Sequence, residues 1–300
     1  MTSPPPPQAS GSWRPFGLFA AALSVAYAWV LWRLFQLSRA ESLDSHVFLI
    51  PAISFYFAWL RRHALPARST PAWPGAILCA LVALTALAAH FGLAFSGRAP
   101  ALRDSLALLT FSYLAGIVAG GFVFLGLPRM KALVFPFAFL IFMVPLPGWL
   151  VEAVEWFLQH GSAEVTAIVF NLTSTPNFRE GLIFKLPGIT LKVAQECSGI
   201  RSTYVLFITC LAAGYLLLSR PWTRAVMALV VIPLGLVRNA IRIYVIAQLC
   251  IHQGPHMIDS RLHREGGPIF FALALIPLFI ILFLLRKAEK PRKHQPQPSV

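Results

Sequence analysis

Long apolar stretches separated by short polar loops run along most of the chain. Lipid offers the backbone no hydrogen-bond partners, so stretches that approach or exceed roughly 20 residues are expected to cross a bilayer as helices. The pattern predicts an all-α polytopic membrane protein with about eight transmembrane helices, at 15–37, 47–60, 73–95, 105–127, 132–147, 203–219, 225–250 and 267–285. The second and fifth stretches are short and bounded by proline. Each is therefore either re-entrant or extended by its neighbours.

The longest polar segment, residues 148–202, interrupts this pattern. In its first part, apolar residues such as Val151, Val154 and Leu158 recur at helical spacing, which predicts an amphipathic helix lying at the membrane surface. Further on, two β-prone runs, 182–186 and 189–193, flank a Pro-Gly turn and predict a short hairpin. The hairpin leads directly to Glu196 and Cys197, so we expect this cysteine at the water boundary.

Composition agrees with a membrane protein. Of 300 residues, 57% are hydrophobic and only 12% are charged, whereas an ordinary soluble domain has about 25% charged residues. We divide the chain into a disordered cytoplasmic N-terminus at 1–14, an integral membrane domain at 15–286 and a basic cytoplasmic tail at 287–300. The first span lacks a small-residue cleavage site, so it is expected to be an anchor and not a removed signal peptide.

Basic and acidic residues fall on alternate loops, which predicts the orientation. The basic loops are expected to face the cytoplasm and carry Arg61, Arg62, Arg68, Arg129, Lys131, Arg220, Arg224, Arg286, Lys287, Lys290, Arg292 and Lys293. Acidic residues fall on the other side, with Glu289 in the basic tail as the exception. Segment 148–202 and the loop before the last span then face outward. The net charge of +14 is explained by anionic lipid headgroups, so no nucleic-acid partner is expected.

Cys197 is the candidate nucleophile of this chain. It lies in the run Glu196-Cys197-Ser198-Gly199-Ile200-Arg201-Ser202, where a polar segment meets an apolar helix. A helix start and a nearby arginine both lower a thiol pKa and favour the thiolate. The alternative is that Cys197 only packs, as unpaired cysteines usually do. Cys79, Cys210 and Cys250 are interpreted as packing residues, and a disulfide between Cys197 and Cys250 is not expected because it would consume the thiol.

Arginine and histidine reach the same side of the membrane. Arg238 and Arg242 are four residues apart on one helix face, in the outer half of the span at 225–250. Charges at this depth are costly and normally belong to a site, the alternative being that they snorkel to the headgroups. His263 and His256 lie just before the last span. Together these residues fit acyl transfer, which needs a nucleophile, a proton carrier and an oxyanion donor.

Motifs of other enzyme classes are missing from the sequence. It contains no His-Glu-x-x-His zinc motif, no Gly-x-Ser-x-Gly elbow, no P-loop and no paired intramembrane aspartates. Metalloprotease, serine hydrolase, ATPase and aspartyl-protease functions are therefore poorly supported. The cysteines also have no metal-ligand spacing, so neither a metal nor a cofactor is expected.

At these residues the chain resembles the exosortase/archaeosortase family of membrane cysteine transpeptidases. The resemblance rests on the cysteine block 196–202, the arginine block Asn239-Ala240-Ile241-Arg242-Ile243, and a histidine block with His263, Gly267 and Phe270-Phe271. An N-terminal block, Asp44-Ser45-His46-Val47-Phe48-Leu49-Ile50-Pro51, is also similar. Together the blocks run through most of residues 40–285.

The resemblance implies cleavage of exported client proteins at a C-terminal sorting signal made of a short motif, a transmembrane helix and a basic cluster. Cys197 would be the nucleophile, Arg242 the oxyanion stabiliser and His263 the proton carrier. In bacterial relatives the short motif is Pro-Glu-Pro-like, and the protein is expected in the inner membrane with a periplasmic active site. Substrate binding is assigned to Arg201, Arg238, Glu196 and Asn239, and His46 is given no role beyond capping or lining the outer site.

Two other functions stay open at this point. In a transporter or flippase, Arg238, Arg242 and His263 would line an anion path. In a structural component of a polysaccharide-export system, Cys197 would be inert. Client proteins and membrane lipids are the expected partners, while the client's identity, the acceptor that resolves the acyl-enzyme and the oligomeric state are left open.

Overall fold

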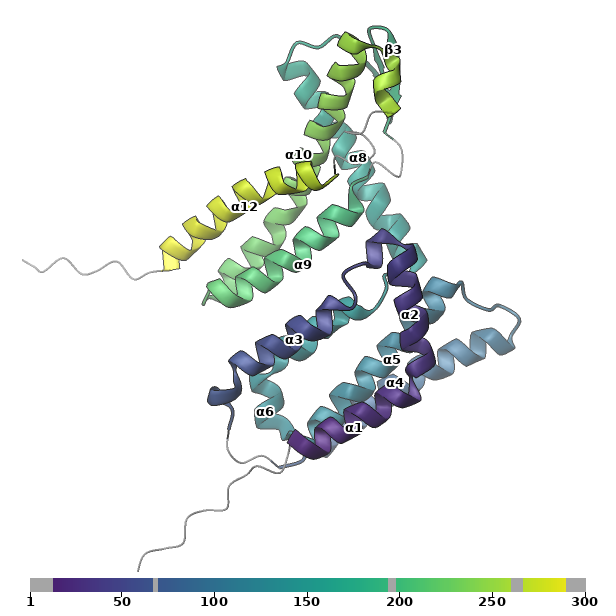
Figure 1. The fold of residues 1–300 in the computed structure, drawn as a ribbon, viewed down its shortest axis with the longest axis vertical. Helices are drawn as coiled ribbons and strands as arrows, with labels where there is room; N and C mark the ends of the chain where they lie inside the picture. The colour runs from purple at the N-terminus through teal and green to yellow at the C-terminus, as the bar shows by residue number, and fades with distance from the viewer. Residues whose placement is uncertain (1–12, 67–69, 194–197, 260–266, 290–300) are drawn as a thin grey trace, which may run out of the picture. The chain divides into compact units, whose positions relative to one another are not determined.

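The computed structural model describes residues 13–66, 70–193, 198–259 and 267–289 (Figure 1). Helices dominate, and one small sheet accompanies them. The chain forms two compact units, residues 1–150 and 151–300. Glu196, Cys197 and His263 lie outside the described residues.

The first unit is helical throughout its described part. Its elements are α1 (Trp13–Ala26), α2 (Ala28–Ala40), η1 (Ser42–Asp44), α3 (Leu49–Leu60), η2 (Arg62–Ala64), α4 (Trp73–Phe95), α5 (Leu102–Phe124), α6 (Gly126–Ala132), α7 (Val134–Phe139) and η3 (Leu140–Met143). The start of α8 (Gly148–Leu172) also belongs to it.

The second unit combines long helices with the sheet. Beyond most of α8, it contains β1 (Phe178–Glu180), β2 (Ile183–Leu186), β3 (Ile189–Lys192), α9 (Ile200–Leu217), α10 (Pro221–Gln253), η5 (Pro255–Asp259) and α12 (Gly267–Glu289). The strands form one antiparallel sheet in the order β1-β2-β3.

Five helices in the described part are long and apolar enough to cross a membrane: α4, α5, α9, α10 and most of α12. Two bent pairs, α1 with α2 and α6 with α7 and η3, raise the number to seven if each pair is one span. The five agree with predicted spans, and the predicted stretch at 73–95 coincides with α4. The predicted count of eight is not confirmed, because the stretch at 47–60 forms α3, a helix of only 12 residues.

A polar cluster within the first unit accompanies the break between α1 and α2, which is bent by 72°. Tyr27, at the break, lies 2.9 Å from the Ser112 hydroxyl, and Ser24 lies 2.8 Å from the Tyr113 hydroxyl. Ser112 in turn donates to the Ala83 carbonyl. Hydroxyl pairs between helices are favourable in lipid because the alternative is an unsatisfied polar group. The apolar pattern alone predicts one continuous span here, which is why the break is missed.

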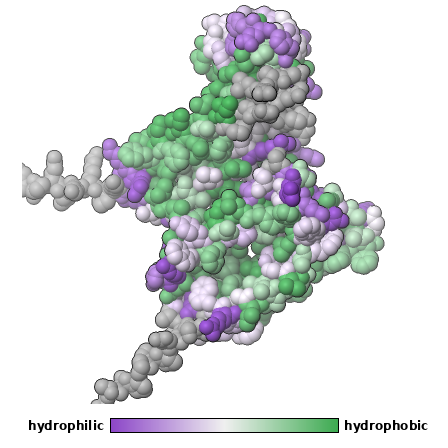
Figure 2. All heavy atoms as spheres, viewed as in Figure 1, coloured by the Kyte–Doolittle hydropathy of each residue, from purple (hydrophilic) through white to green (hydrophobic). Residues whose placement is uncertain are grey.

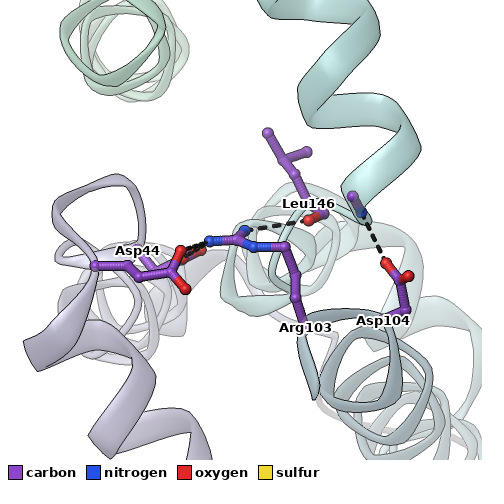
Figure 3. Close-up of polar contacts among 6 residues, drawn as sticks. Asp44, Arg103, Asp104 and Leu146 are labelled. Carbon is purple, nitrogen blue, oxygen red and sulfur yellow. Dashed lines mark hydrogen bonds and ion pairs between the residues drawn. The ribbon is translucent and has the colours of Figure 1, made fainter. Parts of the chain in front are cut away.

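An ion-paired cluster fixes the turn between α2 and α3 against the start of α5 (Figure 3). Arg103 donates from Nη2 to Asp44 Oδ2 at 2.6 Å and to Glu41, and from Nη1 to the Leu146 carbonyl at 3.2 Å. Next to it, Asp104 accepts the Gly148 backbone N–H at 2.7 Å, at the first residue of α8. The Asp44 side chain is only 2% exposed, so Arg103 is the group that permits its burial.

We expect Arg103→Met to destabilise the protein by about 3–5 kcal/mol at neutral pH, because it leaves a buried carboxylate without its cation. Burial raises the pKa of Asp44, while the charge and hydrogen bond of Arg103 hold it down. Without Arg103 that pKa rises further, and a protonated Asp44 needs no cation. Melting curves of the purified protein should therefore show a smaller loss at about pH 5 than at about pH 8.

The matched control is the double variant Arg103→Met, Asp44→Leu, which removes both charges and should recover most of the stability. Glu41→Gln should change little, since the Glu41 side chain is 48% exposed. A double variant as unstable as the single one would contradict the role assigned to the ion pair.

The three spans of the second unit pack around a shared apolar core. Buried members from α9, α10 and α12 include Leu206, Met227, Val231 and Leu278. At one end of this bundle, the Glu289 carboxylate accepts the backbone N–H groups of Ser219 at 2.7 Å and Arg220 at 2.9 Å, as well as the Thr223 hydroxyl. It thus caps the first residues of α10, where the helix dipole favours negative charge. This explains the one acidic residue on the basic side.

Apolar side chains cover much of the helical surface on the face that Figure 2 shows. In α12, Ile276, Phe279 and Phe283 are each more than half exposed, whereas Leu278 and Leu282 are buried. The most apolar part of α4 is only 11% buried. A soluble protein would bury such residues, so these faces are interpreted as lipid-facing.

The sheet confirms the predicted hairpin and extends it by one strand. Pro187 and Gly188 form a two-residue loop, and Gly188 takes a φ of 78° that few other residues adopt. The pairing Leu186 with Ile189 and Phe184 with Leu191 places alternate apolar side chains on one face. That face packs on the buried Phe170 of α8.

Candidate active site

Helix α10 is longer than a membrane span requires. Its 33 residues measure about 50 Å at roughly 1.5 Å per residue, whereas about 20 residues cross a bilayer. Its early part packs on α9 and α12 through Met227 and Val231, and its late part packs on the sheet and α8 through Ala247 and Tyr244. The arginine block lies between these two parts.

Arg238 of α10 contacts the residue that precedes α9. Its Nη2 donates to the Gly199 carbonyl at 3.3 Å and to the Thr203 hydroxyl at 3.4 Å. Arg238 is only 7% exposed, so it does not snorkel to the surface. The cysteine block is thereby in direct contact with Arg238, 39 residues further along the chain and immediately before the arginine block.

Gly199 is required by this contact. It has a left-handed φ of 74° as the N-cap of α9. A Cβ at this position would lie 2.8 Å from Arg238 Nη2 and 3.3 Å from Asn239 Oδ1. Both the backbone conformation and the packing therefore favour glycine.

Asn239 connects the same place to α8. Its Nδ2 donates to the Ser162 hydroxyl at 3.0 Å, and both side chains are buried. Closer to the bundle, Gly235 allows Thr203 to approach, since a Cβ there would lie 2.8 Å from the Thr203 hydroxyl. Three helices therefore meet at one buried polar cluster, which we define as Ser162, Gly199, Thr203, Arg238 and Asn239.

The two other arginines near this cluster differ in exposure. Arg242, one turn beyond Arg238, is half-buried, and the two positive charges repel one another. Arg201 lies on the first turn of α9 and is exposed. The structure thus brings the predicted residues Arg238 and Asn239 to the start of α9, and Arg242 follows one turn further along α10.

Predictions for Glu196, Cys197 and His263 remain untested, because these residues lie outside the described part. His256 lies in η5 and is exposed. His46 is half-buried in the first unit, where burial lowers the pKa of its imidazole.

Sequence reasoning missed Ser162 and Thr203. A lone serine in an amphipathic helix carries no signal of function, and Thr203 resembles any small residue at a helix start. The remaining cysteines are free thiols: Cys79 is half-buried, and Cys210 and Cys250 are buried. Within the described ranges, no three His, Cys, Asp or Glu side chains gather in a way that could hold a metal ion.

We expect Gly199→Ala to be more destabilising than Gly188→Ala. Both glycines have a positive φ, so each alanine incurs about 1–2 kcal/mol of backbone strain. Around Gly188 a Cβ meets nothing within 4 Å, whereas at Gly199 it meets Arg238 Nη2. Melting temperatures of the two variants measure the difference, and equal losses would argue against close packing of Arg238 on Gly199.

The family model Exosortase_EpsH, described as transmembrane exosortase, matches residues 37–280. The matched range contains the cysteine, arginine and histidine blocks. No curated protein sequence and no solved structure matches the chain.

Proposed function

Since the chain belongs to the transmembrane exosortase family, we propose that it is a membrane-embedded cysteine endopeptidase or transpeptidase. Its substrates are exported client proteins with a C-terminal sorting signal of a short motif, a transmembrane helix and a basic cluster. The site faces the periplasm of a bacterial inner membrane. The observation that carries the proposal is the hydrogen bond from Arg238 to Gly199, which holds the cysteine block against the turn of α10 where the arginine block begins.

The reaction begins with the Cys197 thiolate, which attacks the carbonyl carbon of the scissile peptide bond. Arg242 stabilises the oxyanion of the tetrahedral intermediate through its fixed, forked N–H donors. His263 gives a proton to the departing amine as the C–N bond breaks, and a thioester to Cys197 remains. Water or an acceptor nucleophile then attacks the thioester, gives its proton to His263 and releases the thiolate.

Confinement to the membrane supports this chemistry. A client anchored by a transmembrane helix presents its motif at a fixed depth, which lowers the entropic cost of orientation. The buried polar cluster lies where α10 leaves the bundle of spans. In this proposal the client's motif is held at the level of that cluster. The α8 helix and the sheet form a partial cover over the site in this proposal.

Cys197→Ala should abolish cleavage and let full-length client accumulate, because the thioester cannot form. Cys210→Ala and Cys79→Ala are the controls, and each should retain most of the processing. Client size is followed by immunoblot in cells, with a client chosen from the same genome for its short motif, single apolar helix and Arg-rich tail. Normal processing by Cys197→Ala, together with substrate-dependent flux, would favour the transporter alternative.

Arg242 and His263 should respond differently to substitution. Arg242→Lys keeps the charge but loses the forked geometry, so turnover should fall roughly 10²- to 10³-fold with the pH profile unchanged. His263→Gln should slow turnover and remove one limb of the pH–rate profile. His256→Gln is the control and should be nearly silent. Loss of activity in His256→Gln but not in His263→Gln would assign the role of proton carrier to His256.

A further inference from the structure

The first turn of helix α9 supplies no acidic side chain for the backbone N–H groups at its N-terminus. Helix α9 is 18 residues long, its N-cap Gly199 has no side chain to cap it, and its first turn contains no acidic residue. The Ile200 N–H makes a long contact, 3.4 Å, with the Ser198 hydroxyl. Backbone N–H groups at a helix start carry partial positive charge and attract anions.

Arg238 adds a full positive charge at this helix start. Its Nη1 is buried and has no hydrogen-bond partner among the described residues, and both contacts of Nη2 are longer than 3.2 Å. Arg103, Arg179 and Lys185, by contrast, each have a carboxylate partner. Arg242 brings a second positive charge nearby and increases the repulsion.

Moving a cation from water into the protein interior carries a desolvation penalty. The penalty is offset only when an anion or other hydrogen-bond acceptors contact the cation. The oxygen atoms of Gly199 and Thr203 are neutral and offset part of it. Arg201, by contrast, is exposed, so its charge is solvated and screened by salt. Arg238 is therefore the cation with the greater need for an anionic ligand.

We propose that Arg238 and the N-terminus of α9 form a carboxylate-binding site that receives an acidic side chain of the client. This inference rests on the proposed function for the source of the carboxylate. A guanidinium binds a carboxylate with two parallel N–H···O bonds, and Nη1 supplies a donor that nothing else in the described residues uses. Because Cys197 precedes Gly199 by two residues, the bound carboxylate belongs to a residue close to the scissile bond.

The first test uses iodoacetate and iodoacetamide on the purified full-length protein. Both reagents alkylate the same Cys197 thiolate, so the ratio of their rates cancels changes in the thiol pKa, and only iodoacetate carries a carboxylate. Arg238→Gln should lower the iodoacetate-to-iodoacetamide ratio by about 10-fold, the loss of one charge-assisted contact. Arg201→Gln is the control and should change the ratio less than about 2-fold. Mass spectrometry of the Cys197 peptide gives both rates.

Two outcomes of this test would overturn the inference. An unchanged ratio in Arg238→Gln means that Arg238 binds no carboxylate. A ratio that rises about 10-fold in Glu196→Gln means that the chain's own carboxylate occupies the site. Arg238→Lys keeps the charge, so its iodoacetate-to-iodoacetamide ratio should lie between that of the unchanged protein and that of Arg238→Gln. This variant also serves as a control for a folding defect in Arg238→Gln. The iodoacetamide rate alone reports whether each variant keeps an accessible thiol.

A second measurement does not need a reactive thiol. In Cys197→Ala protein, sodium succinate should raise the melting temperature above that in sodium chloride of equal ionic strength, since a ligand of the folded state stabilises it. Arg238→Gln in the same background should remove this rise. If the rise persists, or if sodium phosphate at equal ionic strength gives a larger one, the site binds another anion, such as a lipid phosphate, and the carboxylate assignment is wrong.

The client separates this inference from the proposed function. Arg238→Gln should raise KM about 10-fold with little change in kcat, and neutralising the client's acidic residue should have the same effect without adding to it. A fall in kcat alone would instead assign Arg238 to the oxyanion. If alkylation and melting behave as expected but no client is cleaved, the carboxylate site stands and the peptidase proposal fails.

Discussion

The burial of Arg238 is the constraint on which the second unit depends. A guanidinium that is only 7% exposed in the middle of a long helix needs oxygen atoms within reach. Here they come from Gly199 and Thr203 of α9, and the neighbouring Asn239 ties α8 to the same place. Small residues at 199 and 235 let the helices approach closely enough. Two neighbouring side chains of α10, Arg238 and Asn239, thus hold α9 and α8 at the same place.

A similar constraint operates in the first unit, with the opposite sign of charge. There the buried group is the Asp44 carboxylate, and Arg103 supplies its cation. The two clusters differ in one respect: Asp44 is neutralised within the chain, whereas Arg238 meets only neutral oxygens among the described residues. This difference separates a structural ion pair from an anion-binding site. In an ion pair both charges are already matched, whereas an anion-binding site keeps a positive charge for a ligand.

Hydrophobic patterning predicts the straight spans well and the broken helices poorly. The stretch predicted at 73–95 coincides with α4, because nothing but apolar length determines a lipid-facing helix. The break at Tyr27 depends on hydroxyl contacts with Ser112 and the neighbouring pair Ser24 and Tyr113, which only the folded unit brings together. The Pro-Gly turn predicts β2 and β3, whereas β1 has three residues and too little pattern to be recognised.

The site follows the same division between local and tertiary signals. Arg238 and Arg242 stand out in sequence because charges within an apolar helix are rare, and their burial is consistent with that signal. Ser162 and Thr203 become visible only through their contacts, because small hydroxyl side chains are ordinary at any helix position. Glu289 shows how tertiary structure explains an exception: the one acidic residue among the basic loops caps α10.

The sequence shows where a charged residue is unusual, and the fold shows whether that residue already has a partner. At Arg238 the described partners are neutral, and the N–H groups of its Nη1 have no acceptor among the described residues. The structure therefore carries information about a ligand that the sequence alone does not.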